Sequence, residues 1–447
     1  MTSVKSLKEF FQVEQRGSTV SREILAGITT FAAMSYIVVV NPMILSLTGM
    51  DRSALLLATV ISAVAGTLVM AIWANLPIAL APGMGSNIVF AQVLVTQMGV
   101  SWKTGLAMVF LNGVIFLLVS LTRWREKIIY AFPDTIKLGM QCSIGIFIAY
   151  LGLRNGGLVV ADQQSFIAFA KLSEPAVLLA FVGIIVTPAL VVLRIPGAFL
   201  ISIVGITIAG LFVHHANGQA VTEWPEHFFG LPAMNSTLLF SFDFQELFAK
   251  FFLLLPITLY FLLSEFFSGT ATLLAIARRA NLLTASGEMP NAKAALSSDA
   301  LSSIVGAAVG TSTVTAFVES VAGVEAGGRT GLSGVVVAGL FALSIFLGPV
   351  LAIIPPQATA PALVLVGMLM MEGLGQLDLV KPESTLPPLT MMLFTVCTGD
   401  LLVGLSVGFF GYTLTMLALR RWANITAMLL ALDSVFIVFL VLRNAIV

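Results

Sequence analysis

Charged residues are scarce in this sequence of 447 residues. Asp, Glu, Lys and Arg together account for 10% of the chain, whereas 58% of the residues are hydrophobic. An ordinary soluble domain carries about 25% charged residues, so this chain has too little charge to cover a water-exposed surface. Basic and acidic residues are equal in number, at 22 each, and this balance gives no indication of a nucleic-acid partner.

Histidine and cysteine are also rare, with three and two copies. His214, His215 and His227 share one polar loop, without the spacing of a zinc site, and no histidine in an apolar segment could serve a nucleophilic serine. A GxxxxGK[ST] phosphate-binding loop is missing as well. We therefore expect neither an enzyme nor a protein with a metal or cofactor. Cys142 and Cys397 lie in apolar segments, where two buried thiols are expected rather than a disulfide.

Long apolar runs occupy most of the chain. Residues 24–47, 54–73 and 176–193 each have about the length of a helix that crosses a bilayer. They lack the alternation of barrel strands, so the expected fold class is an all-α polytopic membrane protein in the cell (inner or plasma) membrane, surrounded by lipid. We predict fourteen transmembrane segments, near residues 22–46, 54–74, 77–98, 104–121, 134–153, 175–193, 197–213, 247–276, 294–309, 311–327, 331–354, 359–371, 385–397 and 400–419.

The longest polar loop separates these segments into two sets of seven. Because seven is odd, the second set must cross the membrane in the opposite orientation, which predicts two inverted repeats. The predicted parts are an N-terminal tail (1–21), a first repeat (22–213), an external loop (214–246), a second repeat (247–419) and a C-terminal apolar segment and tail (420–447). Residues 424–445, with Asp433 in their middle, either span the membrane or lie along its interface.

The distribution of basic residues indicates the orientation. A cytoplasmic N-terminus places most lysines and arginines in cytoplasmic loops, as the positive-inside rule requires, with Lys103, Arg154 and Lys171 as exceptions. The tail has no apolar core directly behind its charges, which favours a retained cytoplasmic segment over a signal peptide. The supporting residues are Arg123, Arg125, Lys127, Arg194, Arg278, Arg279, Lys293, Arg329, Arg420 and Arg421.

The third segment of each set is interrupted by proline or glycine. The two segments read LPIALAPGMGSNIVFA and GTSTVTAFVESVAGVEAGGRTG. Irregular backbone at membrane depth is tolerated only inside the protein or along a cavity. Interrupted segments at matching places in the two halves indicate a substrate site near the membrane midplane, where freed N–H and C=O groups bind a polar ligand. Close helix packing at small residues is the alternative.

Four carboxylates lie in or beside predicted spans, where an ionisable group is costly and is a functional candidate. Glu265 has no basic residue within a dozen positions, so its carboxyl is a candidate for proton exchange or for binding a substrate N–H. A structural hydrogen bond to a neighbouring helix is the alternative. Glu319 is a candidate for the same roles. Asp299 is expected to cap the ninth segment, and Glu325 is expected to pair with Arg329 near the cytoplasmic face.

Three stretches resemble the azaguanine-type purine permeases, a branch of the xanthine/uracil/ascorbate family of nucleobase–cation symporters. They are GSTVSREILAGITTFAAMSYIVVVNPMIL, ANLPIALAPGMGSN and GTSTVTAFVESVAGVEAGGRTGLS, and the resemblance extends over nearly the whole chain. It implies a core domain that contains segments three and ten, each with a short extended stretch. It also implies a gate domain built from segments five to seven and twelve to fourteen. Nucleobase uptake driven by protons, often by homodimers, is implied as well.

The resemblance also assigns residues. Glu265 matches a position that faces the base, and Glu319 with Ser320 matches the acid of the tenth segment. Asn87 and Asn41 match further polar positions of the family. The chain departs from the family pattern at Ser268, Ala271 and Glu325, where Asp, Gly and a small residue are usual. These departures leave the identity of the base open.

The expected function is that of a proton-coupled symporter that imports a purine (hypoxanthine, guanine or adenine) by alternating access. Glu265 and Glu319 would accept hydrogen bonds from ring N–H groups, and one of them would carry the coupled proton. The base would stack on Phe266, Phe267 or Phe317. The alternatives are a transporter of the same fold for a pyrimidine base or a small anion, and an uncoupled facilitator or channel.

Overall fold

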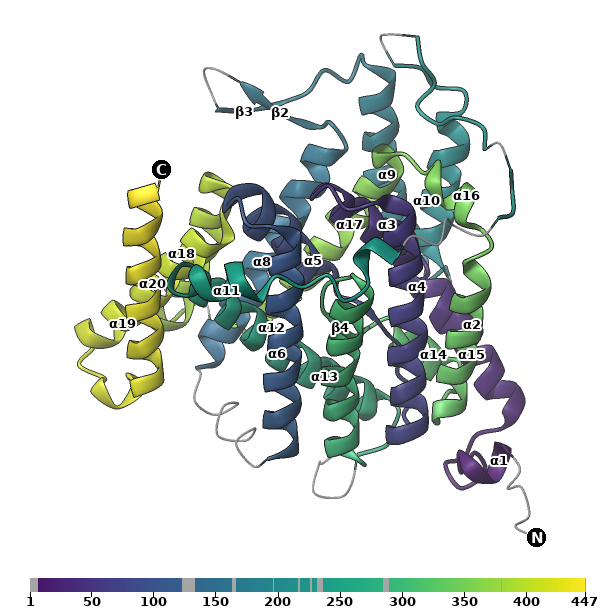
Figure 1. Ribbon diagram of the computed structural model, residues 1–447, viewed down its shortest axis with the longest axis horizontal. Helices are drawn as coiled ribbons and strands as arrows, with labels where there is room; N and C mark the ends of the chain where they lie inside the picture. Colours follow the sequence, from purple (N-terminus) through teal and green to yellow (C-terminus); the bar gives the residue numbers. More distant parts are fainter. Residues whose placement is uncertain are drawn as a thin grey trace.

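The structure is a computed structural model of the chain. It describes residues 7–122, 133–162, 166–195, 197–215, 218–225, 227–230, 236–283, 289–378 and 380–446. Arg123, Arg125 and Lys127, which supported the predicted orientation, lie outside these ranges, as does part of the predicted external loop. Figure 1 shows a bundle of helices with the N-terminal segment at one end.

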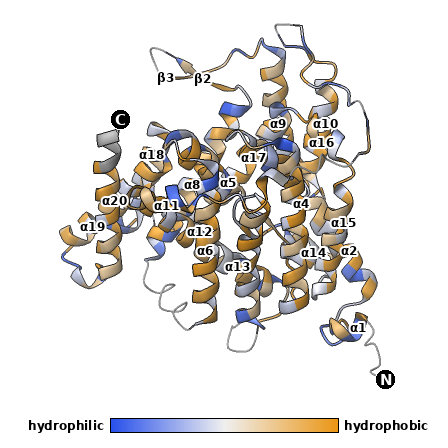
Figure 2. Cartoon of the chain, viewed as in Figure 1, coloured by the Kyte–Doolittle hydropathy of each residue, from blue (hydrophilic) through white to orange (hydrophobic). Residues whose placement is uncertain are grey.

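The predicted apolar segments form helices, and the chain is a multi-pass helical membrane protein. Within the described ranges, eight helices are long and apolar enough to cross a membrane. Three shorter apolar helices accompany them: Ala198–Gly210, Gly331–Ser344 and Ala427–Val441. Hydrophobic residues extend along the helices (Figure 2). The eight long helices are Val20–Ser46, Arg52–Ala74, Trp102–Leu121, Asp134–Asn155, Pro175–Val192, Phe251–Arg279, Pro356–Gln376 and Leu401–Ala418.

The elements divide at the polar loop near residue 230. Before it lie α1 (Leu7–Phe10), α2 (Val20–Met34), α3 (Ile37–Ser46), α4 (Arg52–Val69), the π-helix η1 (Met70–Ala74), β1 (Leu80–Pro82), α5 (Met84–Ile88), the π-helix η2 (Val89–Gln97), α6 (Trp102–Leu121), α8 (Asp134–Asn155), β2 (Val159–Asp162), β3 (Phe166–Phe169), α9 (Pro175–Val192) and α10 (Ala198–Gly210). After it lie η3 (Ser236–Leu238), α11 (Phe244–Ala249), α12 (Phe251–Arg279), α13 (Ala292–Val309), β4 (Val314–Ala316), α14 (Ser320–Glu325), α15 (Gly331–Ser344), α16 (Gly348–Ala352), α17 (Pro356–Met370), η4 (Met371–Gln376), α18 (Pro382–Thr398), α19 (Leu401–Ala418), η5 (Trp422–Asn424) and α20 (Ala427–Ile446).

Helix capping explains several of these boundaries. The Asp51 side chain accepts the backbone N–H of Ala54 at 2.8 Å and begins α4. Asp400 accepts the N–H of Leu402 at 2.9 Å and begins α19. Both side chains supply an acceptor to a helix end whose first N–H groups have no partner within the helix.

The two interrupted segments meet in the structure. β1 and β4 form an antiparallel pair in which Leu80 lies opposite Ala316 and Pro82 lies opposite Val314. Further backbone bonds extend the pair at both ends, from Gly83 N–H to Thr313 O at 2.9 Å and from Phe317 N–H to Ala79 O at 3.0 Å. The short extended stretches expected in segments three and ten are therefore present, and they lie side by side inside the helical bundle.

A second strand pair was not predicted. β2 pairs with β3 as an antiparallel hairpin between α8 and α9, and Figure 1 shows the hairpin projecting from one end of the bundle. Cys142 is buried and Cys397 is exposed, and neither forms a disulfide. The expectation of two free thiols is confirmed. The prediction that Cys397 is buried was wrong, because its side chain lies on an outer face of α18.

The C-terminal helix α20 packs against α12 and α19. The carboxyl of Asp433 accepts a hydrogen bond of 2.6 Å from the Thr413 hydroxyl on α19. The apolar segment predicted at 424–445 is therefore helical and attached to the bundle.

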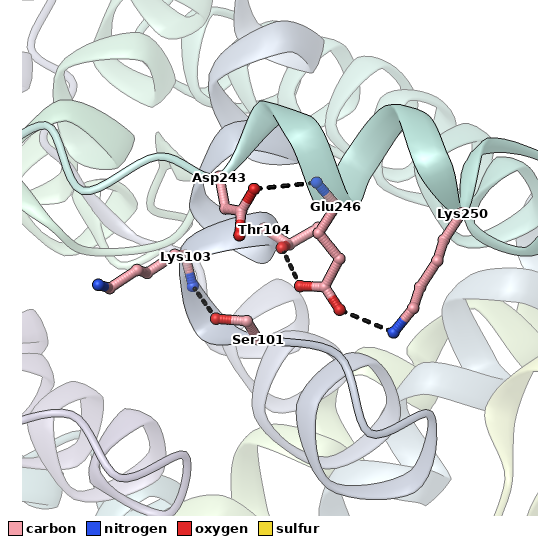
Figure 3. Close-up of polar contacts among 6 residues, drawn as sticks. All are labelled: Ser101, Lys103, Thr104, Asp243, Glu246 and Lys250. Carbon is pink, nitrogen blue, oxygen red and sulfur yellow. Dashed lines mark hydrogen bonds and ion pairs between the residues drawn. The ribbon is translucent and has the colours of Figure 1, made fainter.

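A polar cluster fastens α11, at the start of the second half, to α6 in the first half (Figure 3). Asp243 caps α11 by accepting the N–H of Glu246 at 2.9 Å. The Glu246 carboxyl accepts hydrogen bonds from the Thr104 hydroxyl and, at 2.7 Å, from the Lys250 ammonium. Burial raises the pKa of Glu246, but these hydrogen bonds outweigh burial and hold the pKa below its usual value.

Candidate functional site

Each strand of the central pair is also bonded by a hydroxyl from the helix that precedes it. Thr67 Oγ1 on α4 accepts the N–H of Leu80 and donates to the carbonyl of Leu80, both at 3.0 Å. Ser303 Oγ on α13 accepts the N–H of Val314 at 3.2 Å and donates to its carbonyl at 2.9 Å. These side chains satisfy backbone groups that a broken helix would leave unpaired in the membrane interior.

Glu265 lies in the middle of α12 and faces this strand pair. Its side chain is 3% exposed, and Oε1 accepts a hydrogen bond of 3.0 Å from Ser303. Oε2 of Glu265 and Oγ1 of Thr313, the residue before β4, are both buried without a hydrogen bond of ordinary geometry among the described residues, and the two side chains lie close enough to interact. A carboxylate oxygen beside a hydroxyl keeps further capacity to accept and donate hydrogen bonds, so the two groups mark a position where a polar ligand or water can bind.

Asp299 on α13 is a second buried carboxylate at the same strand. It is 1% exposed, and Oδ1 accepts the N–H of Ala316 at 3.0 Å. Oδ2 lies 3.5 Å from the Thr315 hydroxyl, and the carboxyl is close enough to Glu265 for their charges to interact. The facing residue on α12 is Gly269, where any side chain would collide with Oδ2 of Asp299.

The expectation that Asp299 caps the ninth segment was therefore wrong. α13 begins at Ala292 and is preceded by Asn291, so Asp299 lies two turns inside the helix. Asp299 and Ser303 are four residues apart and therefore lie on one face of the helix. This spacing could have indicated from the sequence that both side chains contact the same strand, β4.

Glu319 lies at the other end of the strand pair. Its Oε1 accepts a hydrogen bond of 2.7 Å from the Tyr36 hydroxyl, in the turn between α2 and α3. The neighbouring Ser320 hydroxyl accepts the N–H of Ala79 at 3.1 Å. The Tyr36 ring lies 4.9 Å from the ring of Phe199 on α10. Tyr36 was not predicted as a site residue, and it connects Glu319 with a helix of the predicted gate.

Asn41 and Asn87 lie together in a closed network of neutral groups. Both are fully buried, and the Asn87 amide donates to Oδ1 of Asn41. Asn41 donates to the hydroxyls of Thr59 at 2.7 Å and Thr311 at 3.0 Å, and Ser312 donates to Asn87. The network joins α3, α4 and α5 to the residues before β4, and a direct role of the two asparagines in binding a base stays a prediction.

The candidate stacking residues differ in position. Phe266 is 2% exposed and contacts Phe116 on α6 edge to face at 5.6 Å. Phe317 directly follows β4, and its backbone N–H belongs to the central strand pair. The side chains of Phe267 and Ser268 lie outside the described part of the structure. Both described aromatic residues therefore lie by the strands: Phe317 follows β4 in the chain, and Phe266 belongs to one hydrophobic cluster with Leu80 of β1 and with Val314 and Ala316 of β4.

The prediction that Glu325 pairs with Arg329 was wrong. Its carboxyl pairs with Arg279 at the end of α12, at 2.6 Å. Arg329 donates instead to the carbonyls of Val324 and Gly328, both at 2.7 Å. The short α14 directs Glu325 towards α12 and away from the loop that carries Arg329, and sequence distance alone gave no sign of this.

The site contains acids, hydroxyls, amides and strand backbone. Within the described ranges, no group of three or more His, Cys, Asp or Glu side chains is placed to hold a metal ion. The three carboxylates Glu265, Asp299 and Glu319 can accept hydrogen bonds and exchange protons. This chemistry suits the recognition of a small polar molecule.

Comparisons with known proteins identify the family of the chain. Residues 21–399 match the profile of a family described as "Permease family". The adenine permease AdeQ of Escherichia coli is 36% identical over 98% of this chain and 96% of its own length. The guanine/hypoxanthine permease PbuO of Bacillus subtilis is 35% identical over 96% of this chain and 99% of its own length.

A solved structure shares the fold. The transmembrane domain of the cyanobacterial bicarbonate transporter BicA superimposes with a TM-score of 0.61 over 88% of this chain and 97% of that domain, at 19% identity. At this identity the likeness concerns the fold alone. From the family match and the full-length relatives, we conclude that the chain is a transporter, not an enzyme, and belongs to the permease family of the xanthine/uracil type.

Proposed function

We propose that the chain is a proton-coupled symporter that imports a purine base by alternating access. The observation that carries the proposal is the buried carboxyl of Glu265 beside the β1–β4 pair, whose Oε2 has no hydrogen bond of ordinary geometry within the described ranges. The printed names of AdeQ and PbuO support a purine as the substrate. A carboxylate oxygen with capacity left to accept a hydrogen bond is suited to a ring N–H of such a base.

The two halves are proposed to be inverted repeats of seven segments, residues 22–213 and 247–419. The bonding of Thr67 to Leu80 and of Ser303 to Val314 supports this, because each half places a hydroxyl of its second helix on the strand of its third segment. With the N-terminal tail 1–21 inside the cell, residues 214–246 are external, and 420–447 follow the second repeat. Homodimers in the cell membrane remain part of this proposal.

The base is proposed to bind between Glu265 and Glu319 at the strand pair. Ring N–H groups donate to the two carboxylates, and the base stacks on Phe317 or Phe266. Ser320, Asn41 and Asn87 hold the two strands in place around it. This arrangement uses a few convergent polar groups in an apolar surrounding, as small-molecule sites usually do.

The Ser303 hydroxyl suggests how a proton is coupled to this site. It lies within hydrogen-bond distance of both Glu265 and the carbonyl of Val314, but it has one proton to donate. With Glu265 ionised, the hydroxyl donates to the carboxylate. With Glu265 protonated, the acid can donate to Ser303, which is then free to bond Val314. Protonation of Glu265 thereby changes the bonding of β4 itself.

Labelled hypoxanthine, guanine and adenine are to be tested for uptake into membrane vesicles, with xanthine and uracil as further competitors. We expect accumulation above the external concentration, and we expect a protonophore to abolish it. Absence of purine uptake and competition would overturn the purine assignment, and preferential competition by uracil would favour the pyrimidine alternative. Uptake that never exceeds equilibrium would favour an uncoupled facilitator.

Glu265→Gln tests the residue itself. We expect weaker binding and a loss of the pH dependence of uptake, because glutamine cannot exchange a proton. Glu325→Gln, which removes an exposed carboxylate paired with Arg279, is the matched control. Unchanged affinity together with unchanged pH dependence in Glu265→Gln would remove Glu265 from the mechanism.

A further inference from the structure

A cavity of about 260 Å³ lies between α3, α4 and α16, away from the strand pair. α4 begins at this cavity with Arg52, and η1 continues it to Ala74. At that far end the Asn75 amide donates to the carbonyl of Phe11 in the N-terminal segment, at 2.9 Å. The cavity therefore lies at the end of the bundle opposite the N-terminal segment, as the positions of α3, α16 and the N-terminus in Figure 1 show.

Arg52 is the cationic residue in the wall of this cavity. Its side chain is part-buried, and one nitrogen donates to the carbonyl of Ile354 at 3.3 Å. No carboxylate pairs with it in the part of the chain that the structure describes. A guanidinium carries five donors in a planar fork, so most of its donors are available to a ligand with two adjacent acceptors.

Pro42 adds an acceptor to the same wall. Proline has no N–H, so the carbonyl of Val38, four residues earlier in α3, lacks its usual helical donor. Val38 and Pro42 both line the cavity, and Pro349 of α16 lies in the opposite wall. The wall of this one space thus contains the Arg52 fork, apolar side chains and the residue whose carbonyl Pro42 leaves without a helical donor.

The size of this space suits a flat two-ring molecule. An engineered cavity of about 150 Å³ is enough to hold a benzene ring, and the cavity here is larger, at about 260 Å³. In its N9–H tautomer, a free 6-oxopurine presents O6 and N7 as neighbouring acceptors, the edge that an Arg fork binds with two hydrogen bonds. Adenine presents an amino donor in place of O6, and this donor would face the donors of Arg52.

We propose that this cavity is a second binding site, selective for 6-oxopurines over adenine. Arg52 donates to O6 and N7, and the Val38 carbonyl accepts a ring N–H. The role of the site as a capture point for the transported base depends on the proposed function. α3 forms its inner wall, and the same helix carries Asn41 and begins beside Tyr36 at the strand pair. A base held here is separated from the transport site by one helix.

The test measures equilibrium binding of labelled hypoxanthine and adenine to the purified full-length protein. We expect the unmodified protein to bind two equivalents of hypoxanthine and one of adenine. Arg52→Gln should bind one of each, and Glu265→Gln should keep one hypoxanthine that depends on Arg52. Arg52→Lys should resemble Arg52→Gln, since an ammonium cannot bind both acceptors as a fork does. Lys171→Gln, an exposed site between β3 and α9, is the control for loss of a positive charge.

Uptake kinetics provide a second measurement. Arg52→Gln should raise the KM for hypoxanthine about tenfold, the scale of one bidentate contact, and should leave adenine uptake unchanged. Unchanged adenine binding also shows that the variant is folded. Wild-type hypoxanthine stoichiometry and KM in Arg52→Gln would overturn the second site. If purine uptake is absent but Arg52-dependent hypoxanthine binding persists, the proposed function fails and this site stands; if hypoxanthine does not bind at all, both fail.

Discussion

The two strands at the centre of this permease are supported alike, but their surroundings differ in charge. Each pairs with the other, and each is bonded by one hydroxyl, from Thr67 or from Ser303. In the first half, the buried polar side chains of α3, α4 and α5 are neutral and bond one another, as Asn41 and Asn87 do. Around β4 the buried polar groups include carboxylates, and Oε2 of Glu265 has no hydrogen bond of ordinary geometry among the described residues.

This difference separates a scaffold from a reactive site. A closed network of amides and hydroxyls holds its members in one arrangement, and none of these groups gains or loses a proton near neutral pH. Buried carboxylates with unused acceptors respond both to a proton and to a ligand. We therefore expect substitutions beside β4 to alter transport, and equivalent substitutions beside β1 to alter mainly stability.

The largest effect is expected for Asp299→Ala. It leaves the N–H of Ala316 unpaired, at a cost of about 1–3 kcal/mol, and removes the charge that faces Glu265. Uptake should fall roughly a hundredfold at equal protein level, since about 1.4 kcal/mol corresponds to a factor of ten. Asp299→Asn keeps an acceptor and should lose less. Ser298→Ala is the control, because that hydroxyl bonds the Ala294 carbonyl of its own helix and no other described residue. Normal uptake in Asp299→Ala would contradict a role for this carboxylate.

A smaller effect is expected for an added methyl group beside each half of the site. Gly269→Ala displaces the Asp299 carboxylate and should lower uptake roughly tenfold, given a cost of about 1–3 kcal/mol for overpacking. Gly334→Ala on α15 brings Cβ to 3.0 Å from the Cβ of Ala71 and 3.6 Å from Cγ2 of Thr67, on the side of β1, and should lower the thermal midpoint with the KM unchanged. The measurements are uptake kinetics and thermal unfolding in detergent. Equal changes in KM for both variants would contradict the division between the halves.

The two supporting hydroxyls allow the most direct comparison. Thr67→Val removes the bonds to Leu80 and should destabilise the fold by about 1–3 kcal/mol without changing the pH dependence of uptake. Ser303→Ala removes comparable bonds to Val314 and, in addition, the donor to Glu265, so it should also shift the pH profile and raise the KM. The measurement is the pH profile of uptake by both variants, which shows whether Ser303, unlike Thr67, affects the pH dependence of transport. The coupling proposed for Ser303 is wrong if its profile matches that of Thr67→Val.

The smallest effect is expected for Glu246→Gln, at the polar cluster of Figure 3. The pKa of Glu246 lies below its usual value because of the hydrogen bonds from Lys250 and Thr104. Its stabilising contribution is therefore present above the pKa of the unfolded state and is lost as the pH falls through the pKa of the folded state. The variant should be less stable by about 1 kcal/mol or less at neutral pH and should match the unmodified protein in acid. A difference in thermal midpoint that persists at low pH would contradict this, and the KM should not change.

The sequence predicted the features that depend on local composition. The length of the apolar runs predicted the helices. The prolines and glycines near Pro82 and Gly310 indicated where two of these helices break. The isolation of Glu265 from basic residues marked it as a site candidate; the structure buries its carboxyl beside the strand pair, and its role in binding stays a prediction. The count of fourteen segments and the domain boundaries stay predictions.

Other features depend on contacts between distant parts of the chain. Tyr36 reaches Glu319 across 283 positions, and local pattern gives no sign of such a pair. Asp299 was expected to be a cap, because only the true start of α13 shows that it lies inside the helix. The pairing of Glu325 with Arg279 was missed because the nearest basic residue in sequence, Arg329, lies on a loop that turns away.

By itself, the sequence determined that this protein lies in a membrane as helices, because its long apolar runs lack the alternation of barrel strands and a helix satisfies its own backbone in lipid. It also determined where two helices must break. The tertiary structure alone decided that the two breaks pair, that the carboxylates gather at one strand and that the neutral amides gather beside the other. Those outcomes depend on which helix faces lie in contact, and contacts between segments more than 200 residues apart are settled only when the whole bundle packs.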